Sequence, residues 1–231
     1  LLCFDRKNYY YSDLPKGFQI TQDKRPIGRN GYLMIEVDGE EKRIDIERLH
    51  MEEDTAKQLH LTDYSLIDYN RAGIPLIEIV TKPCIRSGKE ASAYLEALRQ
   101  VFLYTEVSDA KLEEGSMRCD VNVSIRPFGQ EAFGTRTEIK NLNSISNVQK
   151  AIDYEAGRQQ EVIESGGEVL QETRRYDEVE KITTVMRSKG DAVDYKYYTE
   201  PNILPIRLDH AWVERIKNEL PMMPGEREKH Y

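Results

Sequence analysis

Two nearby stretches of the sequence have an alternating pattern: polar and charged side chains alternate with apolar ones in residues 118–126, and charged side chains alternate mainly with threonine and isoleucine in residues 135–141. Successive side chains of an extended strand point to opposite faces, so each stretch is predicted to form a strand with one polar face. Paired as an antiparallel hairpin, the two strands would bring together Arg118, Asp120, Asn122, Arg126, Arg136, Glu138 and Lys140. Oxygen ligands hold Mg²⁺ and cations neutralise phosphate, so this mixture suits Mg²⁺-nucleotide chemistry. A solvated face laced with ion pairs has the same composition.

A single carboxylate interrupts the apolar segment 75–80, which is predicted to form a short strand. Glu78 would share its face with Leu76 and Val80, and burying a carboxylate is costly unless it is paired or binds a metal. The residue type is consistent with a metal ligand and equally with a structural ion pair, for example with Arg71.

Two acidic runs provide further candidate ligands. The run 50–54 closes a predicted strand, and alternation places Glu53 on the opposite face from Glu52 and Asp54, so one of these faces can point into a cleft. Three consecutive acids are also typical of a solvated turn. The triplet Glu113-Glu114-Gly115 is equally ambiguous, and an exposed loop is its simpler interpretation.

The sequence lacks the glycine-rich loops that hold nucleotides at a helix N-terminus. Neither Gly-x-x-x-x-Gly-Lys-Ser/Thr nor Gly-x-Gly-x-x-Gly opening a helix is present. There is also no Gly-x-Ser-x-Gly elbow. A nucleotide bound to this protein would therefore lie on a sheet and be held by side chains.

Hydrophobic periodicity and turn residues predict the elements that must position these groups. Residues 33–37 and 43–47 alternate around Asp38-Gly39, which predicts a hairpin. Ser87 and Glu90 form a capping box before a helix that ends near Tyr104. A second long helix is predicted from about Ser144 to the glycine pair at 166–167, and the rest predicts a strand pair at 170–175 and 183–187, a proline-rich connection at 195–205 and a last helix at 211–220.

Early strands with irregularly interleaved helices favour an α+β fold with a mainly antiparallel sheet over a doubly wound parallel one. Of the 231 residues, 39% are hydrophobic and 32% are charged, which allows a sizeable core. No apolar run approaches the ~20 residues of a membrane span. The chain opens without Met and shows no signal-peptide pattern, so we expect a missing or trimmed N-terminus.

Net charge and cysteine usage narrow the partners and the compartment. A net charge of −8 argues against a stand-alone nucleic-acid binder, because that affinity requires a basic surface, although a local basic patch can still contact RNA. Three separated cysteines and four scattered histidines suggest no disulfide framework and no zinc site. A reducing compartment, the cytosol or an organelle matrix, is therefore the expectation.

Several blocks of the sequence resemble those of the B subunits of aspartyl/glutamyl-tRNA(Asn/Gln) amidotransferases. The most specific are FDRKNYYYSDLPKG at 4–17, DYNRAGIPLIEIV at 68–80, LEEGSMRCDVNVS at 112–124 and GTRTEIKNLNS at 134–144. The run 50–54 and the segment 166–175 also fit, in the same order along nearly the whole chain. Several blocks exceed ten residues, so chance agreement is negligible.

The resemblance implies a core similar to the sheet-based catalytic domain of glutamine synthetase at residues 1–205, lacking its N-terminal strand. Residues 206–231 would begin a helical linker toward a tRNA-binding region. The implied reaction is ATP- and Mg²⁺-dependent phosphorylation of the side-chain carboxylate of Glu-tRNA(Gln), Asp-tRNA(Asn) or both. Ammonia from a partner amidase subunit (A) then yields the amide, and a small subunit (C) clamps the pair. The implied nucleic-acid partner is the tRNA acceptor end, with neither DNA nor a membrane involved.

Carried over by position, Glu53 and Glu78 match the Mg²⁺ ligands of the family best, with Glu52 as the adjacent alternate. The remaining ligands of the family, a Glu and a His, should lie upstream of Leu1. Strand faces add Asp120 and Glu138 as catalytic residues beside Glu53 and Glu78. They also add three cations as nucleotide-binding residues: Arg118, Arg136 and Lys140. Departures from the family blocks, such as Thr81-Lys82-Pro83-Cys84, touch none of the proposed ligands.

Two other functions remain open from the sequence. A free-standing ligase similar to glutamine synthetase would act on a small amino acid without tRNA. A non-catalytic scaffold subunit would bind tRNA or partners without turning over ATP, and would leave the acid-and-cation face and Glu78 unexplained. Activation of a carboxylate needs oxygen ligands and cations but no protein nucleophile, which agrees with the missing nucleophile motifs.

Overall fold

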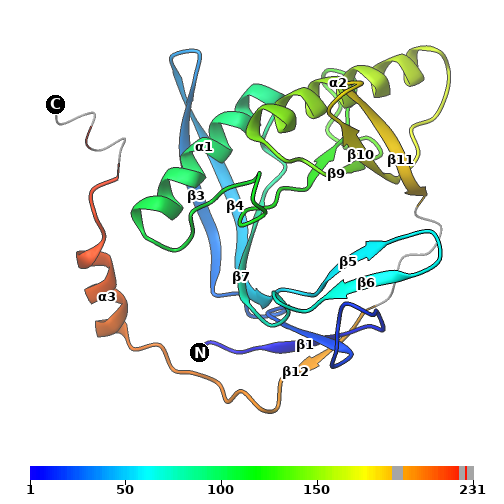
Figure 1. Cartoon of the computed structure of the whole chain (residues 1–231). Coiled ribbons are helices and arrows are strands. Elements are labelled where there is room, and N and C mark those ends of the chain that lie inside the picture. The colour runs from blue at the N-terminus through cyan, green and yellow to red at the C-terminus, as the bar shows by residue number, and fades with distance from the viewer. Residues whose placement is uncertain (189–194, 224–226, 228–231) are drawn as a thin grey trace. The chain divides into compact units, whose positions relative to one another are not determined.

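The computed structural model describes residues 1–188, 195–223 and 227. The chain divides into two compact units: unit 1 consists of residues 1–32, 45–84 and 193–220, and unit 2 of residues 33–44, 85–192 and 221–231. Both units combine strands with helices, and antiparallel strand pairs predominate, which confirms the predicted α+β fold (Figure 1). No helix among the described residues is long and apolar enough to cross a membrane.

The first sheet of unit 1 is built around the N-terminal strand. Strand β1 (Asp5–Asn8) pairs antiparallel with β2 (Phe18–Thr21) on one side and with β12 (Lys196–Thr199) on the other. The proline-rich connection predicted at 195–205 is therefore wrong at β12, because pairing with a strand far away in the sequence makes these residues extended. The last helix, α3 (His210–Glu219), begins as predicted and is capped by Asp209.

Residues 206–231 contain α3, while residues 224–226 and 228–231 of this predicted linker lie outside the described residues. The assignment of the segment as a linker toward a tRNA-binding region stays a prediction.

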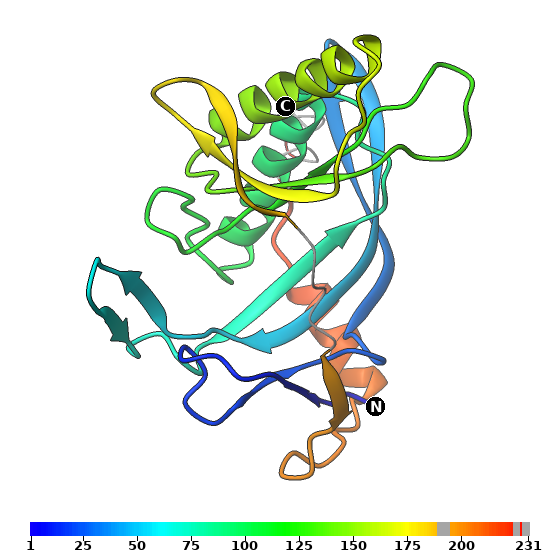
Figure 2. The ribbon, with the colours of Figure 1, turned by 90° about the vertical axis from the view of Figure 1, so that its right-hand side faces the viewer.

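The second sheet has β4 (Glu40–Glu53) between β3 (Gly28–Val37) and β7 (Pro75–Thr81). Figure 2 shows β3 and β4 as long, curved strands. The connecting residues Asp38 and Gly39 have φ angles of 57° and 81°, and two positive φ values are what the predicted two-residue hairpin turn requires. A separate ribbon pairs β5 (Lys57–His60) with β6 (Ser65–Asp68).

Unit 2 contains two long helices and a four-stranded sheet. Helices α1 (Gly88–Tyr104) and α2 (Ile145–Glu164) contact each other, and α2 also contacts the sheet at β8 and β11. The strand order is β11-β10-β9-β8. Strands β8 and β9 are antiparallel, as predicted, whereas β9 and β10 are parallel. The bounds are Val121–Val123 for β8, Thr137–Lys140 for β9, Glu172–Asp177 for β10 and Ile182–Ser188 for β11.

Both long helices begin at the residues that the sequence predicts. The side chain of Ser87 accepts a hydrogen bond from the Glu90 N–H at 3.1 Å, and that of Ser144 accepts one from the Asn147 N–H at 3.1 Å. Beyond α2, Gly166 has a φ of 80°, a conformation that favours glycine and ends the helix. Local capping chemistry therefore determines where these helices start and stop.

The core of unit 2 contains a fully buried carboxylate, Glu155 on α2. It accepts hydrogen bonds from Arg158 at 2.6 and 2.9 Å, from Gln159 at 2.9 Å and from Thr183 at 2.8 Å. The guanidinium of Arg174 on β10 lies 3.6 Å from the same carboxylate. Burial alone would raise the pKa of Glu155, but these hydrogen bonds hold that pKa below its ordinary value. The network joins α2 to β10 and β11.

Candidate functional site

Strands β4 and β7 place a cluster of three ionisable side chains on one face of unit 1. His50 lies directly opposite Glu78 in the antiparallel ladder, and Glu52 lies two residues farther along β4 on the same face. The Nε2 atom of His50 is 3.4 Å from a Glu52 oxygen and 3.9 Å from a Glu78 oxygen. One ligand atom from each residue lies within 4.8 Å of the other two, so one cation can contact all three.

A β-bulge in β4 places Arg48, His50 and Glu52 on the opposite face of the sheet from Ile46. The register of β4 against β7 shifts between Ile46 and Arg48, where two residues of β4 oppose one of β7. Beyond the bulge, Leu49 and Met51 continue the face of Ile46. Simple alternation from Ile46 would have put His50 on the apolar face, so the bulge is what separates the cluster from it.

The three side chains of the cluster differ in burial. The exposed fraction of the side chain is 4% for His50, 16% for Glu52 and 49% for Glu78. The expectation that Glu78 is buried is therefore wrong, because β7 is an edge strand of its sheet. Arg71, the partner considered for Glu78, lies 3.0 Å from Asp54. An exposed carboxylate at a sheet edge needs no internal partner and remains accessible to a ligand.

Glu53, the first choice as a ligand from the sequence, is engaged elsewhere. Its carboxylate accepts a hydrogen bond from the Ile20 N–H at 2.8 Å and forms an ion pair with Lys16. Strand alternation puts it on the other face of the ladder from Glu78. Glu52, the alternate, is the acid that the structure brings together with Glu78, and the assignment of Glu53 as a ligand stays a prediction.

A hollow of about 90 Å³ opens at the cluster and is also lined by two cations, Lys7 from β1 and Arg48 from β4. The Lys7 ammonium lies 4.3 Å from the ring centre of Tyr195 and 5.5 Å from that of Tyr9, which favours a cation at this position. Among the residues that the structure describes, neither cation forms an ion pair with a carboxylate. Carboxylates and available cations in one hollow match the needs of a metal and a phosphate group.

Tyr9 adds a neutral hydroxyl near the cluster. Its ring packs edge-on against Tyr195, with 5.3 Å between the ring centres. Burial raises the pKa of Tyr9, and the nearby acids Asp13, Glu52 and Glu53 raise that pKa further. The Tyr9 hydroxyl therefore stays protonated at neutral pH and can act as a hydrogen-bond donor.

The donor chemistry of the cluster fits Mg²⁺ through its carboxylates. Mg²⁺ is commonly bound by one or two carboxylates while it keeps several water ligands, and Glu52 and Glu78 supply that number. Imidazole is a donor more typical of zinc and other transition metals. The Nε2 atom of His50 instead faces both carboxylates, while its buried Nδ1 atom has no hydrogen-bond partner among the described residues.

The polar face predicted from strands 118–126 and 135–141 lies in unit 2, and several of its charges are paired with each other. The Lys140 ammonium is 2.8 Å from Asp120 and 3.7 Å from Glu138. The Thr173 hydroxyl on β10 donates a hydrogen bond to Glu138 at 2.8 Å. The two predicted catalytic acids of this face thus lie beside Lys140, and their catalytic role stays a prediction.

The predicted strand 118–126 is longer than the observed β8, because only residues 121–123 pair with β9. The N–H of Ile125 donates to the Gln159 side chain at 3.2 Å instead of to the ladder. The guanidinium carbon of Arg126 lies 4.7 Å from the ring centre of Phe133. Arg118 and Arg136 are exposed, and their predicted role in nucleotide binding, like that of Lys140, stays a prediction.

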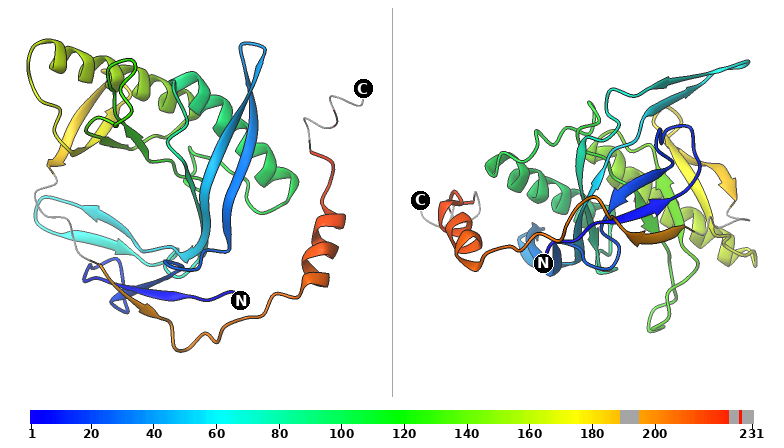
Figure 3. Two further views of the ribbon diagram at one scale, coloured as in Figure 1. Left: turned by 180° about the vertical axis from the view of Figure 1, so that it is seen from behind. Right: turned by 90° about the horizontal axis from the view of Figure 1, so that it is seen from below.

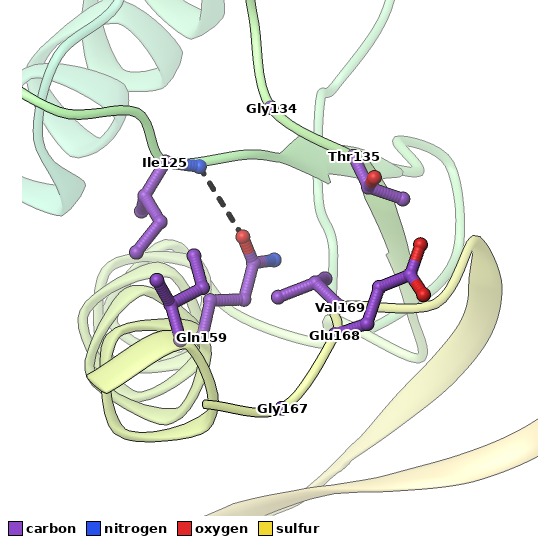
Figure 4. A pocket seen from close by; sticks show the side chains of 8 residues that line it. Ile125, Gly134, Thr135, Gln159, Gly167, Glu168 and Val169 are labelled. Carbon is purple, nitrogen blue, oxygen red and sulfur yellow. Dashed lines mark hydrogen bonds between the residues drawn. The ribbon is translucent and has the colours of Figure 1, made fainter. Parts of the chain in front are cut away.

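A larger hollow in unit 2, of about 200 Å³, offers less chemistry (Figure 4). It is lined by apolar side chains such as Ile125 and Val169, and by Gln159, whose amide oxygen already accepts the bond from Ile125. Glu168 is its one carboxylate, and it contains none of the predicted site residues. The smaller hollow of unit 1, with its acids and cations, is therefore the better candidate.

The acidic triplet Glu113-Glu114-Gly115 lies in a loop whose two acids are exposed. Glu114 pairs with Lys111 at 2.8 Å, and Gly115 has a φ of 72°. The simpler interpretation of this run, an exposed loop, is confirmed.

The comparison with protein families decides the wider assignment. Residues 1–214 match the family model described as "GatB/GatE catalytic domain". The chain belongs to this family. It is 58% identical over 228 residues to the B subunit of the aspartyl/glutamyl-tRNA(Asn/Gln) amidotransferase of Staphylococcus aureus strain MRSA252. The proteins of the same name from S. aureus and from its strain JH9 are equally similar.

The matches cover 99% of this chain and 48% of the S. aureus relative, so the chain spans about half the length of the curated relatives it matches. The family assignment drawn from the sequence blocks is confirmed. The GatB/GatE match spans residues 1–214 and hence covers all of the predicted site residues. It names a catalytic domain without assigning a role to any of these side chains.

Of the residues that line the hollow of this GatB/GatE chain, only Glu52 and Glu78 were predicted as site residues; the others are Lys7, Thr21, Gln22, Asp23, Arg48, His50 and Tyr197. Arg48 and His50 occupy alternate positions with Glu52 on one strand, so a charged period-two pattern was available as a signal. Lys7 and Tyr197 belong to strands of the other sheet, β1 and β12, and no local pattern connects them with β4. Only the tertiary structure brings these two side chains to the hollow.

Proposed function

We propose that this chain is the catalytic core of an amidotransferase subunit that activates the side-chain carboxylate of Glu-tRNA(Gln), Asp-tRNA(Asn) or both, using ATP and Mg²⁺. The observation that carries the proposal is the hollow of unit 1, where Glu52 and Glu78 lie with His50 and the cations Lys7 and Arg48. The GatB/GatE family assignment and the names of the S. aureus relatives support it. Ammonia supplied by a partner amidase subunit would complete the reaction.

The chemistry explains why both acids and cations are needed. A free carboxylate reacts poorly with ammonia because its oxygen is a poor leaving group. When the γ-phosphoryl group of ATP is transferred to one carboxylate oxygen, that oxygen becomes part of a good leaving group. Ammonia then attacks the carbonyl carbon, the C–O bond to phosphate breaks, phosphate leaves with the bonding electrons, and the nitrogen loses one proton, which the phosphate can accept, to give the amide. The reaction needs charge stabilisation and no protein nucleophile.

Each residue of the hollow has a role in this proposal. Glu52 and Glu78 would hold Mg²⁺, which when bound offsets the repulsion between the triphosphate and the substrate carboxylate. Lys7 and Arg48 would contact phosphate or carboxylate oxygens through charge-assisted hydrogen bonds. His50 would hold Glu52 in place through the contact of 3.4 Å between its Nε2 atom and the Glu52 carboxylate.

The proposal is tested by Glu78→Gln in the complete amidotransferase. Glutamine keeps the size of the side chain but removes the charge that would hold Mg²⁺. We expect amide formation on mischarged tRNA to be abolished while the amidase subunit still hydrolyses glutamine. Glu36→Gln, an exposed acid on β3 outside the cluster, is the matched control and should behave as the wild type.

Amide formation at the wild-type rate by Glu78→Gln would remove this residue from the mechanism. Amidation of free glutamate in the absence of tRNA would point to a ligase for small amino acids. Running both charged tRNA species, Glu-tRNA(Gln) and Asp-tRNA(Asn), in the same assay identifies the substrate.

A further inference from the structure

Two buried glutamine side chains of unit 1 hold the backbone of β4 on either side of Glu52. The exposed fraction is 6% for Gln19 and 1% for Gln22. The Oε1 atom of Gln22 accepts a hydrogen bond of 2.9 Å from the Met51 N–H. The side-chain amide of Gln19 donates one of 2.8 Å to the Glu53 carbonyl. We call Gln19 and Gln22 the glutamine clamp.

The glutamine clamp lies where β4 extends beyond β3. Strand β3 begins at Gly28, and a Cβ atom at Gly28 would lie 3.4 Å from the Cβ atom of Leu49. Met51 and Glu53 lie farther along β4. Backbone groups that are buried without a hydrogen-bond partner are costly. A glutamine side chain carries the donor and the acceptor of a peptide unit, so the clamp takes the place of a neighbouring strand.

The clamp joins the strand that carries Lys7 to the strand that carries Glu52. Gln19 lies directly opposite Lys7 in the β1–β2 ladder, so their side chains share a face. Gln22 follows β2, and its amide nitrogen donates a hydrogen bond of 3.0 Å to the Cys3 carbonyl, just before β1. Lys7, Gln22 and Glu52 all line the hollow. The left-hand view of Figure 3 shows the N-terminal strands, in dark blue, next to the lower end of the second sheet.

A different set of contacts holds the two proposed metal ligands together. In the β4–β7 ladder, His50 lies opposite Glu78, and Glu52 lies opposite Leu76. The clamp residues belong to neither strand of this ladder. Removing the clamp should therefore change the separation between Lys7 and Glu52 and leave Glu52 beside Glu78.

We propose that Gln19 and Gln22 are positioning residues that set the separation between Lys7 and Glu52. The inference rests on the proposed function, in which Lys7 would contact phosphate and Glu52 would hold Mg²⁺. A phosphate bound to that metal must reach the Lys7 ammonium at the same time, so the two strands must keep a fixed spacing. A misplacement of about 1 Å between reacting groups can lower a rate by about 100-fold. The glutamines act through the strands that they join.

The proposal is tested by Gln22→Met in the complete amidotransferase. Methionine keeps the length of the side chain and removes both hydrogen bonds. At a temperature where circular dichroism shows the variant to be fully folded, the single-turnover rate of amide formation should fall about 10- to 100-fold. The Mg²⁺ concentration for half-maximal activity should stay within about twofold of wild type, because the β4–β7 ladder is intact. A wild-type rate would overturn the proposal, as would a Mg²⁺ shift as large as that of Glu52→Gln.

Gln159→Met in unit 2 is the matched control for lost stability. Gln159 is also fully buried, and its amide also binds two backbone groups, the Ile125 N–H at 3.2 Å and the Val123 carbonyl at 3.1 Å. This variant should lower the melting temperature at least as much as Gln22→Met, while the folded enzyme keeps its rate. A loss of rate equal to that of Gln22→Met would attribute both losses to weakened folding and overturn the proposal.

A double-mutant cycle with Lys7 identifies the group through which Gln22 acts. Lys7→Met removes the ammonium and should lower the rate by itself. Adding Gln22→Met should then lower the rate less than about twofold further, because no cation is left to be positioned. Losses that multiply would show that Gln22 acts on another group. A wild-type rate for Lys7→Met would overturn the inference together with the role of Lys7 in the reaction.

Hydrogen exchange at the Met51 N–H measures the clamp without ATP, Mg²⁺ or tRNA. Exchange should be at least about tenfold faster in Gln22→Met than in the wild type, because the N–H loses its acceptor. Unchanged exchange would reject the clamp while leaving the proposed function in place. Faster exchange together with wild-type amide formation by Glu78→Gln would instead reject the proposed function, and with it the positioning role of the clamp.

Discussion

Two sheet faces of this protein carry similar mixtures of acids and cations, but, in the part of the chain that the structure describes, the acids and cations of a face form ion pairs with each other only in unit 2. In unit 2, Lys140 lies between Asp120 at 2.8 Å and Glu138 at 3.7 Å. In unit 1, Glu52 and Glu78 contact His50 and form no ion pair with a lysine or arginine among the described residues. The cations beside them, Lys7 and Arg48, likewise have no carboxylate partner in the described part of the chain.

The difference shows that composition alone does not identify a site for a ligand. Exposed ion pairs contribute little to stability and are common on protein surfaces, so the face of unit 2 has an ordinary explanation. Charges that gather around a hollow without pairing with each other have no such explanation. For this reason the hollow of unit 1, rather than the face of unit 2, is the better candidate for the reacting groups.

The largest expected difference between the two faces is in catalysis. In the complete amidotransferase, Glu52→Gln should lower the rate of amide formation about 10³-fold, because several kcal/mol of charge stabilisation depend on the metal it would hold. Glu138→Gln should lower the rate less than about tenfold. Single-turnover assays on mischarged tRNA measure both variants. Equal losses would break the comparison and support the catalytic role that the sequence predicts for Glu138.

A second test concerns the metal itself and separates two adjacent acids. Glu52→Gln should raise the Mg²⁺ concentration for half-maximal amide formation at least about tenfold, since a ligand is lost. Glu53→Gln should leave this concentration within about twofold of wild type, because its carboxylate is bound to Ile20 and Lys16. A larger shift for Glu53→Gln would restore it as the ligand predicted from the sequence.

Unit 2 also contains ion pairs that are buried, around Glu155. Glu155→Gln should lower the free energy of unfolding by about 3 kcal/mol, because a buried charge is lost from the network and Arg158 and Arg174 would keep only Glu172 as a carboxylate partner. Urea denaturation of the wild type and the variant measures the difference. A loss below about 1 kcal/mol would show that these arginines reach water or another acid.

The same carboxylate should make stability depend on pH. The pKa of Glu155 is lower in the folded protein than the ordinary value of 4.5, so its ionisation stabilises the fold above that value. This contribution is lost as the pH falls through the lower, folded pKa. Unfolding free energies of wild type and Glu155→Gln should therefore differ most near neutral pH, and the difference should shrink as the pH falls through the folded pKa of Glu155. A difference independent of pH would contradict this account.

The smallest effect is expected for the exposed ion pair of unit 2. Asp120→Asn should change the free energy of unfolding by less than about 1 kcal/mol, because its pair with Lys140 is half-exposed and screened by water and salt. Denaturation at low and high salt provides the measurement. A loss above about 2 kcal/mol would mean that the pair is part of a stronger network than its exposure suggests.

Elements set by short-range chemistry could be predicted from the sequence. The helices follow from the caps Ser87 and Ser144, and the hairpin follows from the turn at Asp38-Gly39. The antiparallel pairing of β8 with β9 could also be predicted, because the alternation of residue types shows which side chains share a face and the two strands are close in the sequence. The length of β8 could not be predicted, since the Gln159 side chain from α2 takes the N–H of Ile125.

The candidate site was predicted only in part. The sequence pointed to Glu78 and to the acidic run around Glu52 and Glu53, but it did not separate the two neighbours. The pairing of His50 with Glu78 decides that Glu52 and not Glu53 lies on the face of Glu78, because a shift of one residue in the register exchanges the two faces of a strand.

The sequence by itself determined the family, the α+β class and where the two long helices begin, because these depend on residues close together in the chain. The tertiary structure alone decided that β12 pairs with β1, that β7 forms a sheet edge with Glu78 exposed, and that Lys7 lines the hollow. These features depend on contacts between residues that are distant in the sequence. Burial and charge pairing are properties of those contacts and not of local residue order.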